Sequence, residues 1–314
     1  MSLIVAIGPS SFGVNDQKPI NRLHEFGIQI KGNPYHRKLS EVEIIDHLKD
    51  VDGLIAGLEP LNRNVLSTAF KLKAIARVGV GMDNIDYEAA CEFGIKVSNT
   101  PEAPSKAVAE MTLTSMLMLC RKSYFANEAL HKKEWKKVIG QSLFGATVLL
   151  IGFGRIGREL KQLLDPFKVK LLVNDPFLNK QNEFNNIPFV SLEEGLAEAD
   201  IISLHASGSS VIIGQSEFNQ MKNGVLLLNS ARGALVDEMA LFDAIHSKKV
   251  AGAWFDVFWT EPYSGKLTDY EQILLTPHIG TYTTQCRLHM EMTAVENLLC
   301  DLNILRSKGI INDL

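Results

Sequence analysis

The chain has 314 residues, more than one ordinary hydrophobic core supports, so we expect two domains. Its net charge of −4, without a basic stripe, argues against nucleic acid as a partner, and no apolar run reaches the roughly 18 residues that span a bilayer. The start "MSLIVAIGPS" lacks the basic region of a signal peptide, and the four cysteines are scattered without a CxxC pair. We therefore expect a cytoplasmic globular protein with reduced thiols and no metal site.

Short apolar runs alternate with amphipathic segments over the first hundred residues. The predicted strands are "LIVAIG", "GLIAG" and "AIARVG", and the predicted helices are "PINRLHEFG", "SEVEIIDHL" and "LSTAFKLK". This alternation predicts a parallel sheet that is covered on both faces. The segment "APSKAVAEMTLTSMLMLCRKSYFANEAL" then predicts one long helix, with Ser105 as its N-cap and Pro104 just before it.

A second series of strands follows the polar segment "HKKEWKKVIGQS", which we interpret as a linker. These strands are "TVLLIG", "KLLVND", "DIISLH", "GVLLLNS", "GAWFDV" and "ILLTP", and most are continuous apolar runs, as expected of strands buried on both faces. The final segment "QCRLHMEMTAVENLLCDLNIL" predicts another long helix. It has no obvious place in the second series, so we expect it to return to the first domain.

The segment "TVLLIGFGRIGREL" contains Gly152, Gly154 and Gly157 in the spacing G-x-G-x-x-G between a strand and a helix. In this context Gly152 permits a tight turn, Gly154 lets the backbone approach a pyrophosphate, and Gly157 lets the helix pack on the strand. The helix N-terminus supplies free N–H donors and positive potential to the phosphates. The alternative is a glycine turn without a ligand.

Asp175 ends the next strand, 18 residues after Gly157. A carboxylate there accepts hydrogen bonds from both ribose hydroxyls of the adenosine and repels a 2′-phosphate. Because Pro176 and Phe177 follow it, rather than Arg or Lys, the sequence favours NAD over NADP. The alternative is an aspartate that only caps a turn.

Several segments together resemble the D-isomer-specific 2-hydroxyacid dehydrogenase family over nearly the full length. They are "ARVGVGMDNID", "NTPEAPSKAVAEMTL", the glycine loop, "LLNSARGALVDEMAL", "AGAWFDVFWTEP" and "TPHIG", and their order and spacing match the family as well. The resemblance implies an α/β fold of two Rossmann-like doubly wound domains. The NAD-binding domain, residues 102–286, would be inserted into a flavodoxin-like substrate domain made of residues 1–101 and 287–314, with the active site in the cleft. It also implies a homodimer formed by the long helix and the arm after it.

The resemblance places the family's catalytic trio on Arg232, Glu261 and His278. Reduction of a 2-keto acid needs a carboxylate clamp, a hydride donor and a proton for the developing alkoxide. The Arg232 guanidinium can hold carboxylate and carbonyl oxygens, and His278 can exchange a proton near neutral pH. Taken alone, Arg232 fits a surface salt bridge and His278 fits a structural histidine. A carboxylate at Glu261 would orient the imidazole and favour its protonated form.

The remaining predicted site residues follow from the same resemblance. Asp256 corresponds to the acid that orients the nicotinamide, and Arg77 is a possible cation for the substrate. The predicted cofactor-binding residues are Gly152, Gly154, Arg155, Ile156, Gly157, Asp175, Ser230, Ala231, Asp256 and Gly280. The predicted substrate-binding residues are Arg77, Gly79, Val80 and Gly81.

Two departures from the family pattern leave alternatives open. Ala206, Ser207 and Gly208 replace a "PLT"-like segment, so the contacts to the adenine are undetermined there. Phosphoglycerate dehydrogenases generally carry arginine in the loop matching "IAGLEPL", where this chain has Gly57 and Glu59; Glu59 would oppose a phosphate if it faces the cleft.

The leading prediction is an NAD-dependent oxidoreductase of D-2-hydroxy acids. The alternatives are a phosphoglycerate dehydrogenase specifically, or an NAD-sensing binding protein like the corepressors that resemble this family. The related formate dehydrogenases carry glutamine at the position of Glu261, so the carboxylate argues for hydroxy-acid chemistry.

Overall fold

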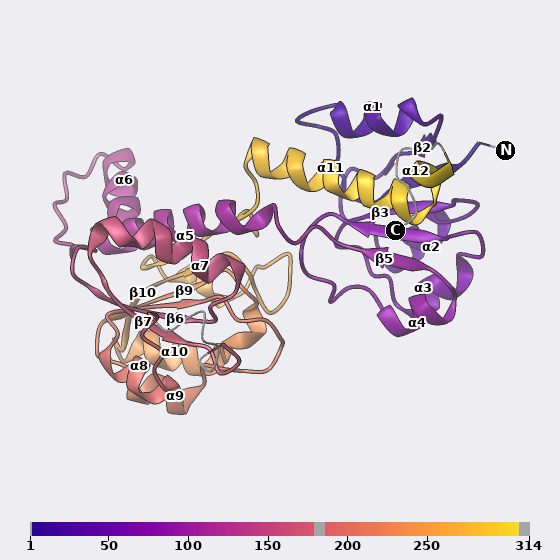
Figure 1. Ribbon diagram of the computed structural model, residues 1–314. Coiled ribbons are helices and arrows are strands. Elements are labelled where there is room, and N and C mark those ends of the chain that lie inside the picture. Colours follow the sequence, from indigo (N-terminus) through magenta and orange to yellow (C-terminus); the bar gives the residue numbers. More distant parts are fainter. Residues whose placement is uncertain (1, 179–185, 308–314) are drawn as a thin grey trace. The chain divides into compact units, whose positions relative to one another are not determined.

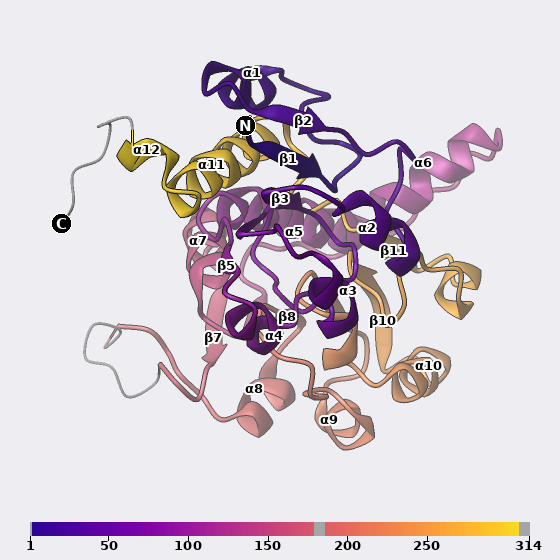
Figure 2. The same ribbon diagram turned by 90° about the vertical axis from the view of Figure 1, so that its right-hand side faces the viewer.

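The computed structural model describes residues 2–178 and 186–307 and folds them into two compact units. Unit 1 comprises Met1–Pro104 and Tyr282–Leu314, and unit 2 comprises Ser105–Thr281. Each unit contains one parallel sheet with helices on both faces (Figures 1 and 2). The predicted α/β class with two doubly wound parts is therefore confirmed.

The sheet of unit 1 has five parallel strands in the order β2-β1-β3-β4-β5. Its strands are β1 Ile4–Ile7, β2 Gln29–Lys31, β3 Gly53–Ala56, β4 Ala74–Arg77 and β5 Lys96–Ser98. Strand β3 is buried along its whole length, as its continuous apolar sequence predicts. The chain leaves the sheet centre in opposite directions from β1 and β3, so the topological switch point of unit 1 lies between these two strands.

Two groups of helices cover the two faces of this sheet (Figure 1). Helices α2 Glu41–His47, α3 Arg63–Thr68 and α4 Tyr87–Glu92 lie on one face; α1 Lys18–Glu25 and α11 Thr284–Asp301 lie on the other, and α12 Ile304–Ser307 follows α11. Helix α11 packs closely on β3, since a Cβ on Gly53 would lie 3.2 Å from the side chain of Leu298.

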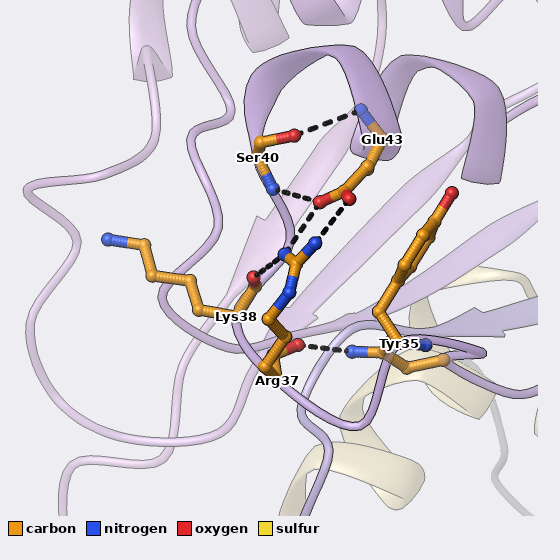
Figure 3. A network of polar contacts seen from close by, with 6 residues as sticks. Tyr35, Arg37, Lys38, Ser40 and Glu43 are labelled. Carbon is orange, nitrogen blue, oxygen red and sulfur yellow. Dashed lines mark hydrogen bonds and ion pairs between the residues drawn. The ribbon is translucent and has the colours of Figure 1, made fainter.

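Helix α2 shows how local sequence sets a helix start (Figure 3). The Ser40 hydroxyl accepts the backbone N–H of Glu43, and the Glu43 carboxylate accepts the backbone N–H of Ser40 at 2.8 Å, which is a capping box. The Arg37 guanidinium then donates to both oxygens of Glu43, at 2.9 and 2.6 Å. These contacts hold the pKa of the Glu43 carboxyl down at about 2.

The sheet of unit 2 has six parallel strands in the order β11-β10-β9-β8-β6-β7. Its strands are β6 Thr147–Ile151, β7 Lys170–Asn174, β8 Ile201–Leu204, β9 Val225–Asn229, β10 Val250–Phe255 and β11 Ile273–Leu275. All six were predicted as strands. The switch point of this sheet lies between β6 and β8, because β7 lies on one side of β6 and all later strands lie on the other.

Alternate side chains of this sheet face two separate cores. Val148 and Leu150 of β6 pack with α5 and α7, whereas Leu149 and Ile151 pack with α8, α9 and α10. The helices are α5 Pro104–Arg121, α6 Ser123–His131, α7 Arg155–Leu164, α8 Leu192–Glu198, α9 Gln215–Gln220 and α10 Glu238–His246, with 3-10 turns η1 Asp165–Phe167, η3 Gly233–Leu235 and η4 Lys266–Asp269.

The predicted long helix after Pro104 was wrong in two respects. It is two helices, α5 and α6, and the break falls at Lys122, whose φ of 51° is left-handed. Neither glycine nor proline marks this break in the sequence. Ser105 is not an N-cap, because α5 already begins at Pro104; proline suits a first helical position, where its missing N–H would have no acceptor within the helix.

Candidate active site

The glycine loop lies at the switch point of unit 2, at the carboxyl end of β6. Gly152 has a φ of +95°, and a Cβ there would lie 2.6 Å from the backbone nitrogen of Ala206, at the end of β8. A Cβ on Gly157 would lie 2.6 Å from the Gly152 carbonyl oxygen, so neither position tolerates a side chain. At Gly154, by contrast, a Cβ would meet no described atom within 4 Å. Gly152 and Gly157 therefore pack tightly against neighbouring backbone, whereas the space next to Gly154 is open.

Helix α7 begins directly behind this open position. Arg155 and Ile156 are in its first turn, and its N-cap is Gly154, which has no side chain that could cap the helix. The positive end of the helix dipole therefore remains available to an anion. The residues present fit the pyrophosphate of a dinucleotide.

Asp175 follows β7 and its carboxylate faces the same loop. Its Oδ2 accepts the backbone N–H of Phe153 at 2.9 Å, inside the glycine loop. Its Oδ1 accepts the N–H groups of Phe177 at 3.0 Å and Leu178 at 3.2 Å. The carboxylate is partly exposed and so keeps lone pairs for ribose hydroxyls while it also ties the glycine loop to the β7 turn.

His205, which was not among the predicted site residues, follows β8 directly and lies beside the glycine loop. Its backbone N–H donates to the Ile151 carbonyl at 2.7 Å, and its Nε2 lies 2.8 Å from the Ser203 hydroxyl. Burial lowers the pKa of this imidazole to about 4, so it is neutral at physiological pH. Its position at the end of a strand next to a switch point was the available signal.

His278 and Glu261, predicted as a pair, are in contact. The Nδ1 of His278 donates to Oε2 of Glu261 at 2.9 Å, and the other carboxylate oxygen accepts the backbone N–H of Phe258 at 3.0 Å. Because a carboxylate only accepts, Nδ1 carries a proton and Nε2 faces away from Glu261. Both side chains are accessible, with 43% of His278 and 31% of Glu261 exposed. His278 itself has a left-handed backbone, with φ 56°.

Arg232 lies in the loop after β9, next to the turn that carries Glu261. Its Nη1 donates to the Ala231 carbonyl at 2.7 Å, and its own carbonyl accepts from Asn229 at 2.8 Å. A Cβ on the following Gly233 would lie 2.5 Å from the Phe258 carbonyl oxygen, so the two loops meet without room for a side chain. The loop that carries Arg232 therefore packs against the turn from Phe258 to Glu261, and Glu261 in turn binds His278.

Asp256 anchors the segment that carries His278. It is only 2% exposed, and its Oδ1 accepts the Thr276 hydroxyl at 2.6 Å and the Ile279 N–H at 2.9 Å, while Oδ2 accepts the Gly280 N–H at 2.8 Å. Burial raises the pKa of this carboxyl, and the three donors oppose that shift. The structure thus gives Asp256 a role in shaping the loop; contact with a nicotinamide stays a prediction.

A hydrogen-bonded relay extends from this anchor into the core. The indole Nε1 of Trp254, which is fully buried, donates to the Thr276 hydroxyl oxygen at 2.8 Å. Thr276 must then direct its own proton to Asp256. The relay Trp254–Thr276–Asp256 therefore has a fixed direction. It passes through the Thr276 side chain, two positions before His278, and ends on the backbone N–H groups of Ile279 and Gly280, which follow it.

The other predicted cofactor residues of unit 2 lie at the same strand ends. The Ser230 hydroxyl lies 3.4 Å from that of Thr112, and the Ala231 N–H donates to Asn229 Oδ1 at 3.0 Å. Gly280 is held by Asp256, as described above. The segment of Ala206, Ser207 and Gly208 follows β8, and Gly208 has a φ of +103°.

The predicted substrate-binding residues belong to unit 1: Arg77 is the last residue of β4, and the other three follow it. Arg77 donates to the Val78 carbonyl, and a Cβ on Gly79, whose φ is +135°, would collide with its guanidinium. Thr100 fixes the Gly79 backbone through two hydrogen bonds, at 2.8 and 3.0 Å. Val80 is exposed and Gly81 is partly exposed. This loop therefore presents an apolar side chain and backbone next to a cation.

Other classes of site find no support in the described part of the chain. Among residues 2–178 and 186–307, no group of three His, Cys, Asp or Glu side chains is placed to hold a metal ion. Within the same ranges, no helix is both long and apolar enough to cross a membrane.

Comparison with known proteins places this geometry in a family. Residues 113–280, more than half of the chain, match the model described as "D-isomer specific 2-hydroxyacid dehydrogenase, NAD binding domain". The chain is 35% identical over 276 residues to hydroxypyruvate reductase of Thermotoga maritima, covering 85% of this chain and 90% of that protein. It is 34% identical over 270 residues to D-3-phosphoglycerate dehydrogenase of Archaeoglobus fulgidus, covering 83% of this chain and 51% of that protein.

A solved structure agrees with these relatives. The fold matches a glyoxylate reductase from Paecilomyes thermophila with a TM-score of 0.83 and 29% identity, over 96% of this chain and 95% of that one. The chain spans about half the length of the phosphoglycerate dehydrogenases it matches. The predicted resemblance is confirmed: the chain belongs to the D-isomer-specific 2-hydroxyacid dehydrogenase family of oxidoreductases, and residues 113–280 match its NAD-binding domain.

Proposed function

We propose that the protein is an NAD-dependent dehydrogenase that interconverts a D-2-hydroxy acid and its 2-keto acid. The observation that carries this proposal is the 2.9 Å hydrogen bond between His278 Nδ1 and Glu261 Oε2. It leaves Nε2 of an accessible imidazole free to exchange a proton with a bound substrate. An imidazole held by a carboxylate is the arrangement that general acid–base catalysis needs.

The reaction also needs a hydride carrier, a group that holds the keto acid and a proton donor. A bound dinucleotide would supply the hydride for reduction and accept it in oxidation. The glycine loop and the start of α7 would hold its pyrophosphate, and the Asp175 carboxylate would accept hydrogen bonds from its ribose hydroxyls. Arg232 clamps the carboxylate and carbonyl oxygens of the keto acid. His278 then donates the proton from Nε2 to the oxygen of the former carbonyl as negative charge develops there, and Glu261 stabilises the imidazolium before that transfer.

NAD is the cofactor we propose, rather than NADP. The support is Asp175, whose carboxylate lies against the glycine loop, at 2.9 Å from the Phe153 nitrogen. A negative group at this place opposes the 2′-phosphate of NADP.

A phosphoglycerate dehydrogenase is the second candidate, because the chain is 34% identical to proteins of that name. The similarity to a hydroxypyruvate reductase over 90% of that protein favours an unphosphorylated substrate. The third candidate is a binding protein that senses the cofactor without catalysing a reaction, like the corepressors that resemble this family.

One experiment separates these candidates. Oxidation of NADH and of NADPH is followed with glyoxylate, pyruvate, hydroxypyruvate and 3-phosphohydroxypyruvate, and the matching D- and L-hydroxy acids are tested for the reverse reaction. We expect NADH-dependent reduction of at least one unphosphorylated keto acid and oxidation of D-isomers only. The control is His278→Asn, since asparagine tolerates the left-handed backbone; it should bind NADH and turn over slowly. NADH binding without turnover of any compound would contradict the proposal and favour the binding protein.

We also propose a homodimer formed through the segment of residues 130–144. This short segment carries four large apolar side chains that are exposed: Leu130, Trp135, Ile139 and Phe144. Several large apolar side chains exposed on one short segment favour an interface with another chain. A second copy is the occupant that the family resemblance implies, and the molar mass in solution at micromolar concentration tests it.

A cytoplasmic location is proposed from the cysteines. Cys91, Cys120, Cys286 and Cys300 are all free thiols, and two of them are buried. Burial raises the pKa of Cys120 and, to about 11, that of Cys286, so both are protonated and unreactive.

A further inference from the structure

The switch points of the two sheets differ in one respect. In open α/β sheets, ligands bind at the crevice outside the carboxyl ends of the strands, at the switch point. In unit 2 that crevice is open, since a Cβ on Gly154 meets nothing within 4 Å. In unit 1 the equivalent crevice lies between the loops that follow β1 and β3, and a side chain of the protein itself fills it.

That side chain is Glu59. It is 1% exposed, and its Oε1 accepts the backbone N–H of Gly57 at 2.9 Å, just after β3. A Cβ on Gly8, just after β1, would collide with the same carboxyl oxygen, and a Cβ on Gly57 would lie 3.0 Å from Oε2. The carboxyl group therefore lies between two glycine backbones, where an anion bound at this switch point would lie.

The site adjoins the predicted substrate loop. Strands β3 and β4 are neighbours, and Val78 N–H donates to the Ala56 carbonyl at 2.9 Å. Asn84 ties the two loops together, since its Nδ2 donates to the carbonyls of Gly57 at 3.2 Å and Glu59 at 2.7 Å. Burial raises the pKa of the Glu59 carboxyl, and the Arg77 guanidinium is close enough for its charge to lower that pKa in part.

We infer that Glu59 occupies the anion position of this crevice and thereby selects 2-keto acids with no second anionic group. The inference rests on the proposed function, because it concerns which 2-keto acids the enzyme accepts. A phosphate there would need the Gly57 N–H and the volume that the carboxyl already takes. Burial raises the pKa of Glu59, but both protonation states fill the same volume, so the exclusion does not require a charge.

The test compares kcat/KM for hydroxypyruvate with that for 3-phosphohydroxypyruvate in the full-length protein. The unmodified protein should favour hydroxypyruvate. Glu59→Ala and Glu59→Ser both open the crevice and release the Gly57 N–H. Each should shift the ratio toward the phosphorylated substrate by about tenfold or more, the effect of one charge-assisted hydrogen bond. The matched control is Glu88→Ala, an exposed glutamate of α4, which should leave the ratio unchanged.

Thermal melting of a second pair of variants tests the packing without using activity. Gly8→Ala should lower the melting temperature, because its Cβ meets the Glu59 carboxyl, and Gly8→Ala with Glu59→Ala should recover much of the loss. Preference of the unmodified protein for the phosphorylated substrate would overturn the inference. So would an unchanged ratio in folded Glu59→Ala or Glu59→Ser. Absence of turnover with every keto acid would instead refute the proposed function, and the melting result would still show whether Glu59 fills the crevice.

Discussion

Replacing Thr276 with valine removes the middle of the relay Trp254–Thr276–Asp256 while keeping the shape of the side chain. The buried indole N–H of Trp254 loses its acceptor, which lies at 2.8 Å, and Asp256 loses the donor at 2.6 Å. An unsatisfied buried donor costs about 1–3 kcal/mol, and a hydrogen bond to a charged group contributes about 1.5–3 kcal/mol. The free energy of unfolding should therefore fall by about 2.5–6 kcal/mol, and toward the lower end of that range because Asp256 keeps the Ile279 and Gly280 donors.

The effect should reach catalysis because Thr276 lies two positions before His278 and the relay ends on the two residues that follow it. We expect kcat for keto-acid reduction to fall in Thr276→Val while the affinity for NADH is kept. Thr276→Ser is the matched control: it retains the hydroxyl and loses one methyl group, worth about 0.8 kcal/mol if fully buried. Denaturant unfolding gives the stability, and steady-state kinetics gives kcat.

A double substitution separates the relay from a general packing effect. Trp254→Phe removes the donor that Thr276→Val leaves unpaired, so the double variant should be more stable than the sum of the two single losses predicts. Strict additivity, or a Thr276→Val protein that unfolds at the same denaturant concentration as the unmodified one, would refute the relay.

Three further predictions concern single residues. His278→Asn should lower kcat by about 10²–10⁴-fold with NADH binding kept, measured by fluorescence titration, and a loss below tenfold would contradict its role as acid and base. Asp175→Ala should narrow the preference for NAD over NADP in kcat/KM, and equal use of both cofactors by the unmodified protein would contradict this assignment. Burial holds the pKa of His205 at about 4 against an ordinary value of 6.5, so between these values the unfolded chain binds the extra proton and stability falls as pH falls. Between pH 6.5 and about pH 4, the free energy of unfolding of His205→Gln should therefore fall less than that of the unmodified protein, as measured by denaturant unfolding. The same pH dependence in both proteins would show that His205 does not contribute.

Much of the fold could be predicted because its signals are local. Apolar strands such as "TVLLIG" and the glycine spacing around Gly154 need only short stretches of sequence. The break between α5 and α6 could not be predicted, because Lys122 adopts a left-handed backbone without glycine or proline nearby. Ser105 was misassigned as the N-cap because proline and serine both mark helix starts. The sequence does not say whether Pro104 lies before the helix or is its first residue, as it is in the structure.

The candidate site was predictable as a set of residues but not as an arrangement. The contact between Glu261 and His278 spans 17 positions along the chain, and only the resemblance suggested it. The burial of Glu59 between Gly8 and Gly57 depends on two separate strand ends meeting, which no local pattern encodes. The same holds for Trp254, whose apolar surroundings predict a core residue but not its hydrogen bond to Thr276.

The division of the chain into two units has a spectroscopic consequence. All three tryptophans, Trp135, Trp254 and Trp259, belong to unit 2, whereas both units contain tyrosines and helices. Tryptophan emission therefore reports the unfolding of unit 2 alone, while far-ultraviolet circular dichroism reports both units. Denaturation curves from the two signals coincide only if the units unfold together, so this natural distribution of fluorophores measures their cooperativity without any label.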